Sequence, residues 1–152
     1  MKRLFPHFPQ RETPPLPARL RVLAEAALLW AALAVAAQLL LPTAPAALPE
    51  GPALFWAGLR ICLVTPLAEE LAFRGAALFL LQPLGGGAAV VVQAVLFAAL
   101  HSSWPARLYA LGMGLIFGRA AQRARGVCPG CILHIINNCL VFAAQLAERG
   151  IR

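Results

Sequence analysis

A long apolar run near the start of the chain is the feature that most limits how this sequence can fold. From Leu20 to Leu41 nearly every residue is Ala, Leu or Val, and Pro42 follows directly. A helix needs about twenty such residues to cross the hydrocarbon core of a bilayer, and proline cannot continue a helix. The run therefore predicts a helix that spans the membrane and ends at Pro42.

Four further apolar stretches follow, at residues 54–81, 88–101, 108–118 and 131–147. The first of them is longer than one untilted span and carries Pro66, where we expect a kink. The next two are short for a bilayer of about 30 Å, so their helices should extend into the loops or be shielded by neighbours. Only 12% of all residues are charged, against about a quarter in soluble domains. The sequence therefore predicts an all-α, polytopic transmembrane bundle of about five spans.

The chain divides into three parts by composition. Residues 1–19 are basic and rich in proline, residues 20–147 hold the apolar stretches, and residues 148–152 form a short polar end. We expect a cytoplasmic tail, a membrane domain and a C-terminal tail. The sequence shows no internal repeat and no soluble second domain.

Basic residues collect at two places that five spans would bring to the same side of the membrane. They flank the start of the first span and separate the fourth span from the fifth: Lys2, Arg3, Arg11, Arg19 and Arg21, then Arg119, Arg123 and Arg125. Positive residues favour the cytoplasmic side, so we expect a cytoplasmic N-terminus. Since the net charge of +7 comes from the ends of apolar runs, we expect no nucleic-acid partner. Glu25 lies one helical turn after Arg21, and we expect these two side chains to pair.

A few strongly polar residues lie inside the expected spans. An ionisable side chain there costs about 2.5 to 3.5 kcal/mol on insertion scales, so such residues usually face a protein interior or a hydrated cavity. They fall on the second, third and fifth spans: Arg60, Glu69, Glu70, Arg74, His101, His134, Asn137 and Asn138. Three helices therefore carry most of the polar groups that need an explanation.

The spacing of these residues predicts that they gather at one point. Glu70 and Arg74 are four residues apart and share a helix face, whereas Glu69 lies on the neighbouring face. His134 and Asn138 are also four apart, and Asn137 lies close enough to the same face to compete with Asn138. A carboxylate, imidazoles and a carboxamide that converge in a cavity poor in water are typical of a site for hydrolysis.

Three short motifs in this order resemble those of a known family. Glu69-Glu70-Leu71-Ala72-Phe73-Arg74 resembles the E-E-x-x-x-R motif of the CPBP family, the CAAX proteases and bacteriocin-processing proteins, also called ABI proteins. Phe97-Ala98-Ala99-Leu100-His101 is similar to its F-x-x-x-H motif, and His134-Ile135-Ile136-Asn137-Asn138 is similar to its H-x-x-x-N motif. All three motifs lie on expected spans, within a candidate catalytic core at about residues 54–147.

The resemblance implies a glutamate intramembrane endopeptidase related to the type II CAAX enzymes. Glu69 and His101 would hold and deprotonate the attacking water, and His134 and Asn138 would stabilise the oxyanion. Glu70 and Arg74 match the remaining motif positions and would support the site, and no cofactor or metal is implied. The spans are fewer than those of the larger eukaryotic enzymes, so the substrate cavity is expected to be more open or to be completed by another subunit.

The resemblance also implies a substrate class and a location. Arg-rich, Ala-rich and Pro-rich composition suggests a bacterium, and a short bacterial member would lie in the inner membrane as a multi-pass protein. Its substrates would be peptide or bacteriocin precursors, or surface proteins that lose a C-terminal membrane-anchoring tail, as proposed for myxosortases. The residues do not choose between these substrates, and they leave the oligomeric state open.

Other interpretations of the same residues remain open. Glu69, His101 and His134 would make a His₂Glu zinc set, although no H-E-x-x-H spacing supports it. Glu70 and Arg74 would serve equally well as a buried ion pair that only fixes the helix. A protein of this fold without catalysis, acting in immunity or as a scaffold, is the alternative to an enzyme.

Cysteine and serine chemistry have weaker support in the sequence. Cys128-Pro129-Gly130-Cys131 has the C-x-x-C spacing of metal and redox sites, but Pro and Gly at the start of a span also suit a helix start. Ser102 and Ser103 follow His101 directly, yet the sequence has no G-x-S-x-G motif. We therefore interpret the cysteine motif as a helix start and do not expect a serine peptidase.

Overall fold

The computed structural model describes residues 12–42 and 47–150, and this part of the chain is helical without a strand. Of the basic tail expected at the N-terminus, Lys2, Arg3 and Arg11 lie outside the described residues. The elements are α1 (Leu16–Leu40), α2 (Pro52–Leu59), η1 (Arg60–Val64), α3 (Thr65–Glu70), η2 (Leu71–Ala77), α4 (Leu78–Leu80), η3 (Gln82–Leu84), α5 (Gly86–Ala99), α6 (Trp104–Ala124) and α7 (Cys128–Gly150).

The second apolar stretch forms one helical path from α2 to α4, and its hydrogen-bond pattern changes along the way. The segments η1 and η2 are π-helical, and they flank α3, which ends at Glu70. Pro66 has no N–H to offer the carbonyl of Cys62, and its ring crowds that carbonyl, so the helix widens before it. At Pro66, where the sequence predicts a kink, the helix thus has a π-helical turn directly before α3, a feature that often accompanies functional sites.

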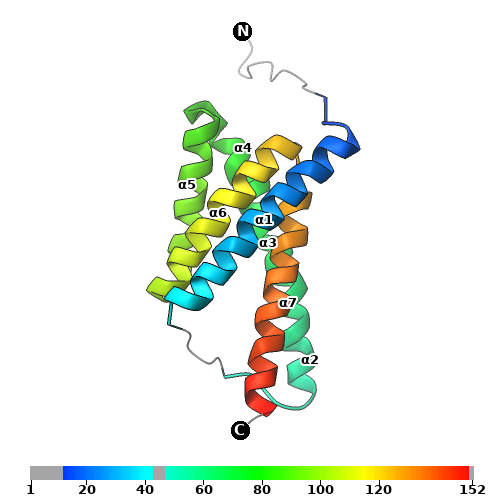
Figure 1. The fold of residues 1–152 in the computed structure, drawn as a ribbon, viewed down its shortest axis with the longest axis vertical. Coiled ribbons are helices and arrows are strands. Elements are labelled where there is room, and N and C mark those ends of the chain that lie inside the picture. The colour runs from blue at the N-terminus through cyan, green and yellow to red at the C-terminus, as the bar shows by residue number, and fades with distance from the viewer. Residues whose placement is uncertain (1–11, 43–46, 151–152) are drawn as a thin grey trace, which may run out of the picture.

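The helices run up and down, and the start of α1 and the end of α7 lie at opposite ends of the described structure (Figure 1). The turn between α6 and α7 lies at the same end as the start of α1. There, Arg123 of α6 forms an exposed ion pair with Glu25 of α1. The pairing of Glu25 with Arg21 that the sequence suggested is thus replaced by a contact between helices.

Small residues allow α5 and α6 to pack closely. A Cβ atom on Gly114 would lie 2.8 Å from the Cα atom of Ala94, and one on Gly118 would lie 2.4 Å from the amide nitrogen of Gln93. The Gln93 amide in turn donates a 2.7 Å hydrogen bond to the carbonyl of Gly114. The two glycines are four residues apart and present one smooth face, as in membrane helix pairs with a G-x-x-x-G motif.

A second packing centre joins α1, α6 and α7. Its buried side chains are Val22 and Ala26 of α1, Leu133 of α7, and Met113, Phe117, Ala120 and Ala124 of α6. This cluster fixes α7 against α6 at the height of His134, which follows Leu133 directly. The candidate site is therefore held on one side by an apolar core.

Two of the described helices, α1 and the segment Cys128–Arg149 of α7, are long and apolar enough to cross a membrane, and α5 is a shorter apolar helix. The helix α6 runs well beyond the expected residues 108–118, whereas α5 stays short. Large apolar side chains lie exposed on the outside of the bundle, among them Leu28, Leu39, Phe79, Val95 and Leu140. A surface of this kind suits lipid rather than water as its surroundings.

The close contact between α5 and α6 gives a first prediction. Gly114→Ala should lower the free energy of unfolding in detergent by about 1 to 3 kcal/mol, because its Cβ meets backbone atoms that cannot move aside. Gly112→Ala is the matched control, since its Cβ meets only the methyl end of Leu33. Thermal unfolding of both variants measures the difference, and equal stability of the two would contradict this packing argument.

Candidate active site

The imidazole of His134 lies between the two neighbouring glutamates of α3. Its Nδ1–H donates a hydrogen bond to Oε1 of Glu70 at 2.9 Å, and its Nε2 lies 3.6 Å from Oε2 of Glu69. One histidine of α7 thus faces two carboxylates of another helix, one on each ring nitrogen. The convergence expected for Glu69, Glu70 and His134 is present in the structure.

Glu70 and Arg74 form a fully buried ion pair beside this imidazole. The Arg74 Nη1 atom lies 3.0 Å from Oε1 of Glu70, and neither side chain is exposed. The guanidinium also lies over aromatic rings, with its carbon 4.3 Å from the centroid of Phe97 and 5.7 Å from that of Phe117. Contact with aromatic faces partly replaces the water that a buried cation loses.

The two carboxylates differ sharply in their surroundings. The side chain of Glu70 is 0% exposed and is shared between Arg74 and His134, whereas that of Glu69 is 30% exposed. Glu69 forms no other ion pair among the described residues. Of the pair, Glu69 is therefore the carboxylate that a water molecule can reach.

A close approach of backbone lets Glu70 reach α7. A Cβ atom on Gly130 would lie 2.1 Å from Oε2 of Glu70 and 3.0 Å from its carboxyl carbon, distances that real side chains do not adopt. Gly130 lies one helical turn before His134, on the same face of α7. Because residue 130 has no side chain, the Glu70 carboxylate that binds His134 fits against the backbone of α7.

His101 joins the site through Phe97. The Phe97 ring lies between the two imidazoles, with centroids 5.0 Å from His101 and 5.9 Å from His134. The Nδ1–H of His101 donates a 3.1 Å hydrogen bond to the carbonyl of Phe97, since a carbonyl can only accept. A neutral His101 then keeps its lone pair on Nε2, which is the atom free to take a proton.

The carbonyl of His101 is itself held by an arginine. The Nε atom of Arg107 donates a 2.7 Å hydrogen bond to it across the turn from α5 to α6. His101 lies two residues after the end of α5, in the short turn before α6, so its carbonyl has no partner within a helix. Arg107 supplies that partner and so fixes the backbone that carries the imidazole.

The two asparagines after His134 point to different neighbours. Buried Asn137 accepts hydrogen bonds from the Tyr109 hydroxyl at 2.6 Å and from the Trp30 indole N–H at 3.2 Å. Asn138 is half-buried, and its amide donates a 2.9 Å hydrogen bond to the carbonyl of Ile61 in η1. The Asn137 amide also donates a 3.1 Å hydrogen bond to the side-chain oxygen of Asn138. Asn137 thus links α1 and α6 to Asn138, which itself contacts the helical path that carries Glu69.

Two residues of the alternative chemistries, Cys128 and Ser103, lie at helix starts. Cys128 begins α7, in agreement with a helix start, and the four cysteines are free thiols. Ser103 caps α6 by accepting a hydrogen bond from the backbone of Ala106. Within residues 12–42 and 47–150, three or more His, Cys, Asp or Glu side chains are nowhere grouped as metal ligands.

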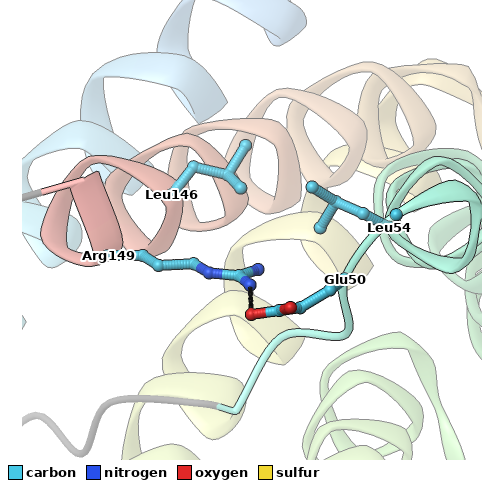
Figure 2. Close-up of a pocket in the computed structure, with 5 residues that line it drawn as sticks. Glu50, Leu54, Leu146 and Arg149 are labelled. Carbon is cyan, nitrogen blue, oxygen red and sulfur yellow. Dashed lines mark hydrogen bonds and ion pairs between the residues drawn. The ribbon is translucent and has the colours of Figure 1, made fainter.

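A pocket of about 520 Å³ lies at the other end of α7, away from these groups. It is lined by Glu50, Gly51, Leu54, Leu146 and Arg149, and Figure 2 shows the ion pair of Arg149 with Glu50 below the two leucines. None of the residues with catalytic chemistry lines this pocket. It therefore does not extend the candidate site.

Sequence reasoning missed several groups that shape the site. Gly130 was interpreted only as part of a helix start, and the roles of Phe117, Arg107 and the Ile61 carbonyl were not foreseen. The signal that the sequence offers for this role is that residue 130, one helical turn before His134, is a glycine. The others depend on contacts between helices, for which the linear sequence gives no spacing rule.

Comparison with known proteins finds one family. The model of the type II CAAX prenyl endopeptidase Rce1-like family matches residues 51–140, which include the two glutamates, both histidines and Asn138. The search of curated proteins and the search of solved structures give no match. The matched residues are more than half of the chain.

The contact at Gly130 gives a second prediction. Gly130→Ala should displace the Glu70 carboxylate from His134 and destabilise the protein by about 1 to 3 kcal/mol, because the added methyl overlaps a buried charged group. Gly75→Ala is the matched control, since its Cβ would make an ordinary 3.8 Å contact with Val127. Unfolding in detergent measures both, and a Gly130→Ala variant as stable as the control would contradict the geometry.

Proposed function

Because the chain belongs to the type II CAAX prenyl endopeptidase Rce1-like family, a family of membrane peptidases, we propose that it cleaves peptide bonds with a water activated by Glu69. The observation that supports this most is the difference between the two adjacent glutamates. Glu70 is buried and paired, whereas Glu69 is partly exposed beside the same imidazole. A general base must reach the water whose proton it takes, and the partly exposed carboxylate of Glu69 can do so.

In this proposal Glu69 and His101 hold the attacking water. The Glu69 carboxylate takes the proton of the water as its oxygen attacks the substrate carbonyl. His101 accepts a hydrogen bond from the same water at Nε2, because its Nδ1–H is occupied by the Phe97 carbonyl. The proton on Glu69 later passes to the leaving amine, so the carboxylate is regenerated.

His134 and Asn138 stabilise the negative charge on the substrate oxygen. They lie four residues apart on one face of α7. Because the Nδ1–H of His134 donates to Glu70, this role requires a proton on Nε2 as well, and Nε2 lies on the Glu69 side of the site. Loss of one oxyanion donor typically costs about a hundredfold or more in rate. Glu70 and Arg74 support the site, since Glu70 fixes the ring of His134 and Arg74 balances the charge of Glu70.

We propose as its substrates membrane-associated peptides or proteins. The two classes foreseen from the sequence are peptide or bacteriocin precursors and surface proteins with a C-terminal anchoring tail. We further propose a multi-pass protein of a bacterial inner membrane with a cytoplasmic N-terminus. Arg123 and Arg125 lie at the same end as the start of α1, in support of this orientation.

The proposed base gives a third prediction. Glu69→Gln should lower peptide cleavage by at least about a hundredfold while the protein remains as abundant as before, because the amide keeps the shape but cannot take a proton. Glu148→Gln is the matched control, since Glu148 is an exposed glutamate near the end of α7. Comparative membrane proteomics of the two strains would show uncleaved precursors or tails only with Glu69→Gln.

The same experiment separates an enzyme from a non-catalytic immunity or scaffold protein. A non-catalytic protein would keep its cellular activity with Glu69→Gln and with His101→Ala. If no polypeptide changes in size between the Glu69→Gln strain and its control, the proposed peptidase function is wrong.

A fourth prediction concerns metal. Because we propose that a carboxylate activates the water, cleavage by purified protein should persist after dialysis against a chelator. Elemental analysis before and after the dialysis checks the metal content directly. Stoichiometric zinc that leaves together with activity would instead support the His₂Glu zinc site.

A further inference from the structure

A network of hydrogen bonds crosses the bundle and ends at the site. The indole N–H of Trp30 in α1 donates to Oδ1 of Asn137 at 3.2 Å and to the hydroxyl of Tyr109 in α6 at 3.1 Å. The Tyr109 hydroxyl donates to the same Asn137 oxygen at 2.6 Å. The Asn137 amide donates to Oδ1 of Asn138 at 3.1 Å, and the Asn138 amide donates to the carbonyl of Ile61 at 2.9 Å. The network thus joins α1, α6, α7 and η1.

The two ends of this network fix the direction in which its hydrogen bonds run. An indole N–H can only donate, and a backbone carbonyl can only accept. Asn137 must therefore turn its oxygen to Trp30, which directs its amide nitrogen at Asn138. Asn138 in turn presents its oxygen to Asn137 and its nitrogen to Ile61. Rotation of either amide by half a turn would place donor against donor and acceptor against acceptor.

We propose that Trp30 and Tyr109 are positioning residues that keep an amide donor of Asn138 directed at the substrate. An amide nitrogen carries two hydrogens, and the hydrogen bond to Ile61 uses one of them. The other hydrogen is the one that the oxyanion role of Asn138 needs, so the inference rests on the proposed function. A rotated amide would present an oxygen in its place, and that oxygen would repel the negative charge that develops on the substrate.

The burial of Asn137 explains how the two aromatic residues can act at a distance. Its side chain is buried, so water does not readily replace a lost donor. A buried oxygen without a donor is costly, and rotation of the Asn137 amide then competes with the native orientation and forces Asn138 to follow. Trp30 lies outside residues 51–140, which the family model matches. The helix α1 therefore contributes to the site from outside the matched region.

Isotope labelling tests the orientation directly, because Asn137 and Asn138 are the chain's two asparagines. Full-length protein with isotope-labelled asparagine, studied by NMR in detergent, should show two side-chain amide groups, and Asn138→Ala assigns them by removing one. The double variant Trp30→Phe, Tyr109→Phe should shift or broaden the signals of Asn138 as well as those of Asn137. Trp56→Phe is the matched control, since Trp56 is exposed on α2, and it should leave both groups unchanged.

Cleavage kinetics test the consequence for the site. Trp30→Phe and Tyr109→Phe each leave Asn137 one donor, so each should lower kcat by about threefold to tenfold. The double variant should lower kcat by up to about a hundredfold, the typical loss of an oxyanion donor. KM should stay unchanged, because the oxyanion forms only in the transition state. When Asn138 is already alanine, neither change should lower kcat further, since both act through Asn138.

The outcomes separate this inference from the proposed function. Asn138 signals that do not respond to the double variant overturn the inference whether or not the protein cleaves a peptide. An equal loss of kcat with and without Asn138 also overturns it, because Trp30 and Tyr109 would then act by another route. If the signals respond in a protein that cleaves nothing, the orientation is supported and the peptidase proposal is what fails. If the double variant does not fold, the two single variants decide by the same measurements.

Discussion

The contact of His134 with two adjacent glutamates is the interaction on which the rest of the structure depends. It joins α3 to α7 through buried polar groups, and a buried carboxylate is tolerated only when positive or donating groups surround it. Arg74 and His134 provide those groups for Glu70. Removal of one member would leave an unpaired charge in the interior, which typically costs about 3 to 5 kcal/mol. Helix positions near the site are therefore set by polar contacts as well as by apolar packing.

The surroundings of this contact depart from regular helix packing in ways that serve the site. The helical path widens on both sides of α3, and the backbone of α7 lacks a side chain at Gly130 where Glu70 enters. Oε2 of Glu70 and the Nε and Nη2 atoms of Arg74 are buried without a hydrogen-bond partner among the described residues. Irregular helices and unsatisfied polar groups cost stability, and they are expected where a protein gives up local regularity for function.

The sequence predicted the helical fold and the approach of Glu69, Glu70, Arg74 and His134 to one another, because both follow from short-range periodicity. A spacing of four placed Glu70 with Arg74, and the apolar stretches indicated the helices. Contacts that depend on the rotation of one helix against another could not be predicted in this way. Arg123 rather than Arg21 pairs with Glu25, and Asn137 turns to Trp30 and Tyr109 although it is only one residue from Asn138. Each of these depends on the register between helices, which no local pattern encodes.

The division of work between Glu69 and Glu70 follows from their places on one helix. Neighbouring residues on a helix differ by about 100° in direction, so one of them points into the protein when the other points to its edge. The inner one, Glu70, is paired with Arg74 and fixes the Nδ1–H of His134. This leaves Nε2 of the ring directed at the outer one, Glu69, which is partly open to water. Two carboxylates of the same kind thus acquire different surroundings, and the different roles we propose for them follow from that difference, as in known pairs of catalytic carboxylates. An exchange of their roles would require α3 to turn by about 100°, which would take the Glu70 side chain out of the space that Gly130 leaves on α7.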